Sequence, residues 1–213
     1  MLSAGYPARC QSCTLNSGHR RRGPARPEAS VAFDSGHEQV NIRKATLADV
    51  PSIEALIATS ARALGASHYS SEQIEAALLG AWGVDTEMIR DGTYSLGFDE
   101  ELVLCGGWSR RETPFGGDAY DHRESRLLDP EREAARIRAF FVHPRWARRG
   151  LASQLLTLCE SEAKASGFAA VELVATLPGE HLYSRHGYVS AGRRSYVLRG
   201  GCSIDFVSMR KEL

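Results

Sequence analysis

Residues able to hold an anion gather in one short segment, Arg148-Arg149-Gly150-Leu151-Ala152. The segment follows an apolar, strand-like run and opens a helical pattern. The first backbone N–H groups of a helix lack partners and its dipole is positive there, so a phosphate is stabilised without a dedicated side chain. Gly150 and Ala152 leave room for close approach, and Arg148 and Arg149 add local positive charge. The segment predicts a turn that binds a polyanion, with a purely structural helix start as the alternative.

Two common classes of phosphate site do not fit this turn. A nucleoside-triphosphate loop carries a Lys-Ser/Thr pair after its glycines, and a dinucleotide fold carries G-x-G-x-x-G; neither is present. The helix that starts here is expected to end near Gly167, and its apolar stripe has a spacing of four: Leu151, Leu155, Cys159 and Ala163. Because Cys159 lies on that stripe and no Cys-His-Asp arrangement is visible, a covalent cysteine route is disfavoured.

The elements around this turn predict a mixed α/β fold. Alternating and apolar runs predict strands at residues 40–43, 93–97, 102–108, 136–142, 170–174, 189–198 and 203–209. Helical periodicity and caps predict helices at residues 46–64, 72–79 and 150–166, and a short one at 181–187. This order predicts a mixed, mostly antiparallel β-sheet of about seven strands with helices on both faces.

The first 38 residues differ in composition from the rest. They are rich in Arg, Gly, Ser and Pro and lack periodicity, so we expect a disordered leader at residues 1–38 and one domain at residues 39–213. Cys10 and Cys13 form a lone C-x-x-C, and His19 alone does not complete a zinc site, so no metal is implied.

Charge and hydropathy limit the partners. Twenty-six basic and 26 acidic residues give a formal net charge of zero, so no global field attracts nucleic acid. No apolar run approaches the roughly 20 residues that cross a bilayer, and the N-terminus lacks a secretory signal pattern. Five cysteines in a chain of this length do not suggest a disulfide scaffold. We therefore expect a cytoplasmic protein that binds neither nucleic acid nor membrane.

Two motifs resemble one known family. The run Val142-His143-Pro144, followed by Arg148 to Ala152, looks like the acetyl-CoA motif of the GCN5-related N-acetyltransferase (GNAT) family. That motif reads Gln or Arg, two residues, Gly, any residue, then Gly or Ala; its leading position falls on Ala147, where Arg148 compensates. The run Leu182 to Tyr188 is similar to the family's later helix, and the element order matches over residues 40–213.

The resemblance implies an acyl-CoA N-acyltransferase fold and acetyl-CoA as co-substrate. In this family the strand before the turn splays from its neighbour, and its main chain holds the pantetheine arm and the thioester oxygen. The expected cofactor-binding residues are Phe141, Val142, Arg148, Arg149, Gly150, Leu151, Ala152 and Ser153.

The resemblance also assigns an acid, but it leaves the base open. Tyr183 matches the tyrosine that protonates the departing sulfur, with a packing tyrosine as the alternative. The family often has a carboxylate on the strand before the turn, and here that strand has none. Glu172 on the next strand is the catalytic candidate, and His143 or a chain of waters are alternatives.

The sequence gives the fewest clues to the residues that contact the amine acceptor. Arg138 is expected to face the acceptor and favour a carboxylate or phosphate, or else to pair with Glu172. Trp108 is expected to contact the acceptor. It borders the long irregular segment at residues 109–133, which we expect to form the acceptor-side wall or lid, with a solvated loop as the alternative.

The sequence therefore predicts an N-acetyltransferase that moves an acetyl group from acetyl-CoA to a primary amine of a small molecule or peptide. Attack would be direct, in a ternary complex. The alternative is a non-catalytic acyl-CoA-binding or sensory module with the same fold. The sequence does not decide between a monomer and a homodimer.

Overall fold

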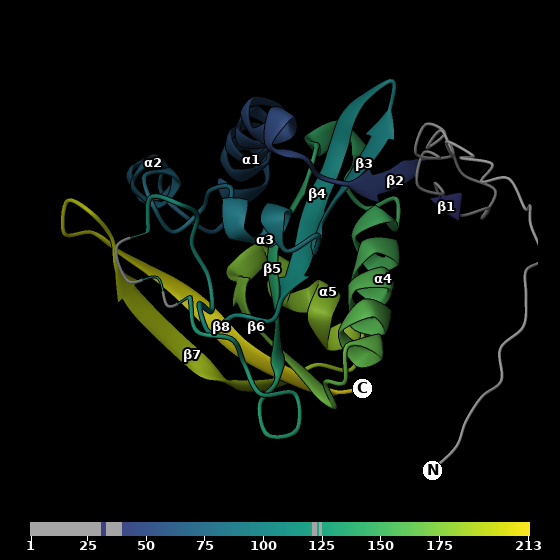
Figure 1. Ribbon diagram of the computed structural model, residues 1–213. Helices are drawn as coiled ribbons and strands as arrows, with labels where there is room; N and C mark the ends of the chain where they lie inside the picture. Colours follow the sequence, from purple (N-terminus) through teal and green to yellow (C-terminus); the bar gives the residue numbers. More distant parts are fainter. Residues whose placement is uncertain (1–30, 33–39, 121–122, 124) are drawn as a thin grey trace, which may run out of the picture.

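The computed structural model describes residues 31–32, 40–120, 123 and 125–213. Within this part of the chain, one mixed sheet of eight strands has the order β1-β2-β3-β4-β5-β6-β8-β7 (Figure 1). All neighbouring strands pair antiparallel except β5 and β6, which are parallel. The predicted fold class is confirmed. The strands are β1 (Val31–Ala32), β2 (Asn41–Lys44), β3 (Tyr94–Asp99), β4 (Glu101–Ser109), β5 (Ala135–Val142), β6 (Ala170–Thr176), β7 (Val189–Val197) and β8 (Ser203–Glu212).

Helices cover both faces of the sheet, and a separate apolar core lies on each face. One face carries α1, α2 and α3, and the other carries α4 and α5 (Figure 1). We call these the α1–α3 face and the α4 face. The helices are α1 (Val50–Gly65), α2 (Ser71–Leu78), α3 (Thr86–Arg90), α4 (Leu151–Ala165) and α5 (Glu180–Arg185), with short 3₁₀ turns η1 (Leu47–Asp49), η2 (Pro144–Trp146) and η3 (Leu177–Gly179).

Local sequence explains where these helices begin. The Ser70 hydroxyl accepts from the Gln73 amide and the Gln73 side chain accepts from the Ser70 amide, so a capping box starts α2. Helix α4 buries the predicted stripe together with Leu156 against the sheet. None of the helices in the described part of the chain has the length and apolar character needed to span a membrane.

Helix α3 and strand β1 were not predicted. Helix α3 has five residues, too few for a helical period, and it begins at an Asp85 cap whose carboxylate accepts from the Glu87 amide at 2.9 Å. Strand β1 lies inside the expected leader and pairs Val31 with Ile42. It brings the strand count from the expected seven to eight. Cys10, Cys13 and His19 lie outside the described residues.

Candidate active site

Strands β5 and β6 part in the middle of the sheet. Their pairing begins at Ala135 with Val171 and ends at Ile137 with Leu173, although β5 runs on to Val142 and β6 to Thr176. The last four residues of β5 are only half-buried, whereas the paired half of this central strand is mostly buried. The second half of β5 is therefore unpaired on its β6 side, and we call the gap between the two unpaired strand ends the groove. Backbone N–H and C=O groups that leave a ladder need other partners, which a ligand in this groove can supply.

A β-bulge shapes the same half of β5. Ala139 and Phe140 stand opposite the single residue Gly106, and Ala139 has a left-handed φ of 58°. A Cβ atom on Gly106 would lie 2.7 Å from the Phe140 ring, so glycine makes room for the bulge. The bulge lies between Ile137, where the β5–β6 pairing ends, and the predicted cofactor residues Phe141 and Val142.

The predicted phosphate turn connects the end of β5 to α4. Gly150 is the N-cap of α4 with φ of 85°, and no side chain caps this helix. A Cβ added at Gly150 would have no atom within 4 Å apart from its own chain neighbours. Arg148 also has positive φ, and both residues are exposed. The guanidinium of Arg149 lies 4.7 Å from the centroid of the Trp146 ring. An uncapped helix start with free space beside it fits a pyrophosphate.

Tyr183 lies on the α4 face beside this groove. Its ring is buried and contacts Phe140 at 6.4 Å between centroids, so α5, which follows β6, touches β5 beyond the end of their pairing. Burial raises the pKa of the Tyr183 phenol well above its ordinary value. The hydroxyl therefore stays protonated at neutral pH and is available as a donor.

His186 joins the two helices of the site, a role that the sequence did not suggest. Its Nε2 lies 2.9 Å from the Ser153 hydroxyl, which belongs to the first turn of α4. This contact links the phosphate turn to the helix that carries Tyr183. The only signal in the sequence was the place of His186 beside Gly187 in the second motif.

Glu172 does not lie at the groove as a free carboxylate. It stands in the paired part of β6, where one oxygen contacts the Arg136 guanidinium and the other accepts from Arg210 at 2.8 Å. Both carboxylate oxygens are thus ion-paired, which argues against the expected role as base. The expected pairing of Arg138 with Glu172 is also replaced, since Arg136 and Arg210 occupy this carboxylate. His143 has its Nδ1 beside the Arg145 amide at 3.3 Å, where it caps η2.

Trp108 is a buried side chain between β4 and α4. It faces the α4 side of β4, is 3% exposed, and its indole N–H donates to Glu162 of α4 at 2.9 Å. Its ring contacts Phe168 edge-on. These contacts make Trp108 a packing residue between β4 and α4, and they correct the expectation that it contacts the acceptor.

Arg138 faces the opposite side of the sheet and is buried. Its guanidinium forms an ion pair with Asp85 at 2.8 Å and donates to the Gly116 carbonyl at 2.6 Å. Burial lowers the pKa of Arg138, and the Asp85 carboxylate opposes that shift. The side chain therefore holds the long 109–133 segment against β5, and these contacts argue against its binding an acceptor carboxylate or phosphate.

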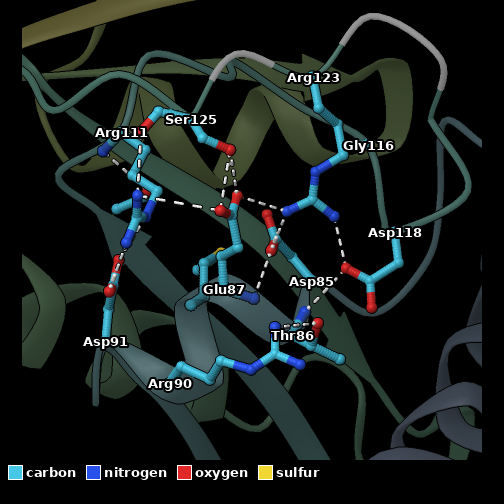
Figure 2. A network of polar contacts seen from close by, with 12 residues as sticks. Asp85, Thr86, Glu87, Arg90, Asp91, Arg111, Gly116, Asp118, Arg123 and Ser125 are labelled. Atoms are coloured by element: carbon cyan, nitrogen blue, oxygen red, sulfur yellow. Dashed lines mark hydrogen bonds and ion pairs between the residues drawn. The ribbon is translucent and has the colours of Figure 1, made fainter.

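A network of charged side chains extends from this pair (Figure 2). Arg123 contacts Asp85, Glu87 and Asp118, and Arg111 pairs with Asp91 at 2.7 Å. The network ties the 109–133 segment to α3. The expectation of a solvated loop does not hold for Arg111, Asp118 and Arg123, because their side chains are tied to α3 and its neighbouring residues.

Comparison with known proteins agrees with this geometry. Residues 128–213 match the family model described as Acetyltransferase (GNAT) domain. No curated protein matches the sequence.

Among solved structures, a GCN5-related N-acetyltransferase from Rhodopseudomonas palustris is similar, with a TM-score of 0.60 and 19% identity over 81% of this chain and 94% of the other. PaiA N-acetyltransferase from Thermoplasma acidophilum, in complex with coenzyme A, has a TM-score of 0.54 and 15% identity over 82% of this chain and 99% of the other. YncA from Salmonella typhimurium, with its cofactor acetyl-CoA, has a TM-score of 0.53 and 15% identity over 82% of this chain and 94% of the other.

These structures share the fold of this chain, with its mixed sheet and helices on both faces. The family-model match covers α4, β6, α5 and the closing hairpin, which include the phosphate turn and Tyr183. Residues 128–213 thus resemble an acetyltransferase (GNAT) domain, and the chain shares the fold of solved N-acetyltransferases.

Proposed function

We propose that this protein is an acetyl-CoA-dependent N-acetyltransferase that acetylates a primary amine by direct attack in a ternary complex. One observation carries the proposal: the uncapped start of α4 follows β5 at the groove where β5 and β6 have parted. A pyrophosphate on the turn and an extended arm along the free edge of β5 would occupy one continuous path. The acetyltransferase domain match and the CoA-bound structures of the same fold support this choice of ligand.

The cofactor contacts come from main chain and from one short turn. We assign the pyrophosphate to the amides of Leu151, Ala152 and Ser153, with Gly150 leaving space and Arg148 and Arg149 adding positive charge. The arm and the thioester oxygen are assigned to the main chain of Phe141 and Val142. Donors that are fixed before the reaction stabilise the charge that develops on this oxygen.

Bound acetyl-CoA supplies the thioester. As the acceptor nitrogen forms its bond to the carbonyl carbon, the carbon–sulfur bond breaks and the electron pair goes to sulfur. Tyr183 donates its phenolic proton toward that sulfur. Because Glu172 is ion-paired, we assign the removal of the amine proton to water.

The test measures CoA binding and turnover separately. We expect Gly150→Glu to weaken CoA binding at least tenfold, because its carboxylate would stand where the pyrophosphate is placed. A tenfold loss of affinity corresponds to roughly 1.4 kcal/mol of binding free energy. Gly192→Glu is the matched control: Gly192 is also exposed, has φ of 113°, and has no atom within 4 Å of the place that a Cβ would take. Calorimetric titration with CoA gives the affinities.

Thiol release from acetyl-CoA across a panel of amines, amino acids and peptides tests the reaction. Release with at least one acceptor is expected from the parent protein. Equal CoA affinity in Gly150→Glu and Gly192→Glu would refute the pyrophosphate assignment. Tight CoA binding without release on any acceptor would instead support the non-catalytic binding module.

A further inference from the structure

Strands β6 and β8 separate at one defined step of the sheet. Their antiparallel pairing ends at Thr176 with Phe206, and one more step would place Leu177 opposite Asp205. At Leu177 the chain also leaves β6 for the turn η3 and then for α5, the helix that carries Tyr183. The place of α5 therefore depends on what holds the main chain at this step.

The missing step would be a hydrogen-bonded pair. Opposite residues of an antiparallel ladder alternate between hydrogen-bonded and non-hydrogen-bonded pairs. At the other end of this ladder the Leu213 amide donates to the Ala169 carbonyl at 2.8 Å. Steps of two from that pair, through a register without a shift, reach Leu177 and Asp205. A direct bond from the Leu177 amide to the Asp205 carbonyl would therefore continue the ladder.

A tyrosine hydroxyl takes the place of that bond. The Tyr69 hydroxyl accepts from the Leu177 amide at 2.8 Å and donates to the Asp205 carbonyl at 2.9 Å. Both main-chain groups thus keep a partner although the strands part. Burial raises the pKa of the Tyr69 phenol to about 12, so the hydroxyl retains the proton that it donates. The Tyr69 oxygen thereby sets the separation of the two strands at this step.

Tyr69 is itself held from the α1–α3 face, opposite the face that carries α5 (Figure 1). It lies in the linker between α1 and α2, where its amide donates to the Gly65 carbonyl at 3.0 Å. Its side chain is buried, and its ring contacts Trp82 edge-on. Gln73 of α2 donates to the Ser203 carbonyl of β8 at 2.6 Å, so this region holds β8 at two points. The hydroxyl is therefore a fixed point for β6 and β8.

The turn after Leu177 connects this fixed point to Tyr183. Leu177 packs against both cores of the sheet. A Cβ added at Gly179 of η3 would lie 3.5 Å from the Tyr183 ring, so this ring packs against the turn. The other side of the contact is Phe140 of β5. A shift of the Leu177 main chain would therefore move the surface on which Tyr183 packs.

We infer that Tyr69 is a positioning residue for the acetyl transfer: its hydroxyl fixes the point where β6 leaves β8 and so holds Tyr183 at the groove. This role rests on the function proposed above. Tyr69 acts through Leu177 and the turn η3, not by contact with the reacting atoms. Since a misplacement of about 1 Å lowers a rate by on the order of a hundredfold, loss of the hydroxyl should affect kcat more than the binding of acetyl-CoA.

The test combines Tyr69→Phe with Tyr183→Phe in a double-mutant cycle. Thiol release from acetyl-CoA is measured with the panel amine on which the parent protein releases thiol fastest. Tyr69→Phe should lower kcat roughly tenfold in the parent protein and leave KM for acetyl-CoA near the parental value. In the Tyr183→Phe protein it should lower kcat no further, because the acid through which it acts is gone.

Tyr196→Phe is the matched control. It removes a hydroxyl from a tyrosine of β7 that packs against the same core as Tyr69, and its kcat should equal that of the parent protein.

A second measurement needs no turnover. Amide hydrogen exchange, followed by mass spectrometry of peptides, compares residues 177–186 with residues 151–165 of α4 in Tyr69→Phe and in the parent protein. Loss of the hydroxyl should raise the exchange rate of residues 177–186 roughly tenfold or more, because local opening there becomes easier. Parental exchange in α4 shows that the variant keeps its fold.

The two measurements separate this role from the proposed function. Equal kcat losses from Tyr69→Phe with and without the Tyr183 hydroxyl, or parental exchange at residues 177–186, would overturn the positioning role and leave the acetyltransferase in place. Absence of thiol release from the parent protein on every amine would reject the acetyltransferase. Faster exchange confined to residues 177–186 would in that case still support the link from Tyr69 to α5.

Discussion

Tyr183 combines burial with a position at the groove. Its ring packs between Phe140 of β5 and Tyr188, and burial raises the pKa of its phenol. A raised pKa keeps a phenol protonated, so the proton is present at neutral pH and is retained above the ordinary tyrosine pKa of 10.0. This protonation suits a donor to a developing thiolate and excludes Tyr183 as the base.

The first prediction concerns a variant that lacks the Tyr183 hydroxyl. Tyr183→Phe should lower kcat by roughly a hundredfold, as loss of a general acid does, with little change in KM for acetyl-CoA. Tyr188→Phe is the control, because it removes a hydroxyl from the adjacent buried ring. Steady-state kinetics at several pH values check both variants. Parental kcat in Tyr183→Phe would remove its role as acid.

Site residues were predictable where the relevant contacts are local in the chain. The Gly150 turn and the apolar stripe of α4 depend on a few neighbouring residues, and both are found where expected. Trp108 and Glu172 depend on partners far along the chain: Glu162 for the former, Arg136 and Arg210 for the latter. No local pattern reveals such partners.

Strand β5 shows a second reason for these errors. Its bulge at Ala139 and Phe140 breaks the alternation of faces, so counting residues from Phe141 back to Arg138 does not give the face of Arg138. The bulge is itself invisible in the sequence, since Ala139 is a residue type that rarely adopts positive φ.

At the scale of elements, close backbone contact holds residues 115–120 against the linker between α2 and α3. The Gly117 amide donates to the Gly80 carbonyl at 3.1 Å, and the Asp118 amide donates to the Val84 carbonyl at 2.8 Å. A Cβ on Gly117 would lie 2.7 Å from the Gly83 main chain. Only glycine permits this approach, so residues 115–120 are docked on this linker.

The second prediction disrupts this docking. Gly117→Ala should displace the segment and lower the free energy of unfolding by about 1–3 kcal/mol, the usual cost of overpacking. It should also raise KM for the acceptor and leave CoA affinity unchanged. Gly65→Ala is the control, because a Cβ there makes ordinary contacts of 3.5 Å or more. Urea unfolding measures both variants, and equal stability would contradict the docking argument.

At the scale of the whole molecule, both cores contain buried acids that are neutral in the folded state. Burial raises the pKa of the Cys105 thiol to about 12 and that of the Tyr69 phenol to about 12. It also raises the pKa of Cys159 and Tyr183 in the core on the α4 face. The two cores therefore respond together to alkaline pH.

This response gives the last prediction, and its sign follows from the raised values. In the unfolded chain these thiols and phenols ionise near their ordinary pKa values of 9.0 and 10.0, whereas the folded state keeps them neutral until about pH 12. Stability is therefore full below pH 9.0 and falls as pH rises to about 12, because the unfolded state releases protons first. Urea midpoints should be flat from about pH 7 to 8 and then drop steeply. Cys105→Ala should make the drop shallower, since one buried acid is removed. A midpoint that stays constant up to about pH 11 would show that these groups ionise in the folded state as readily as in the unfolded chain.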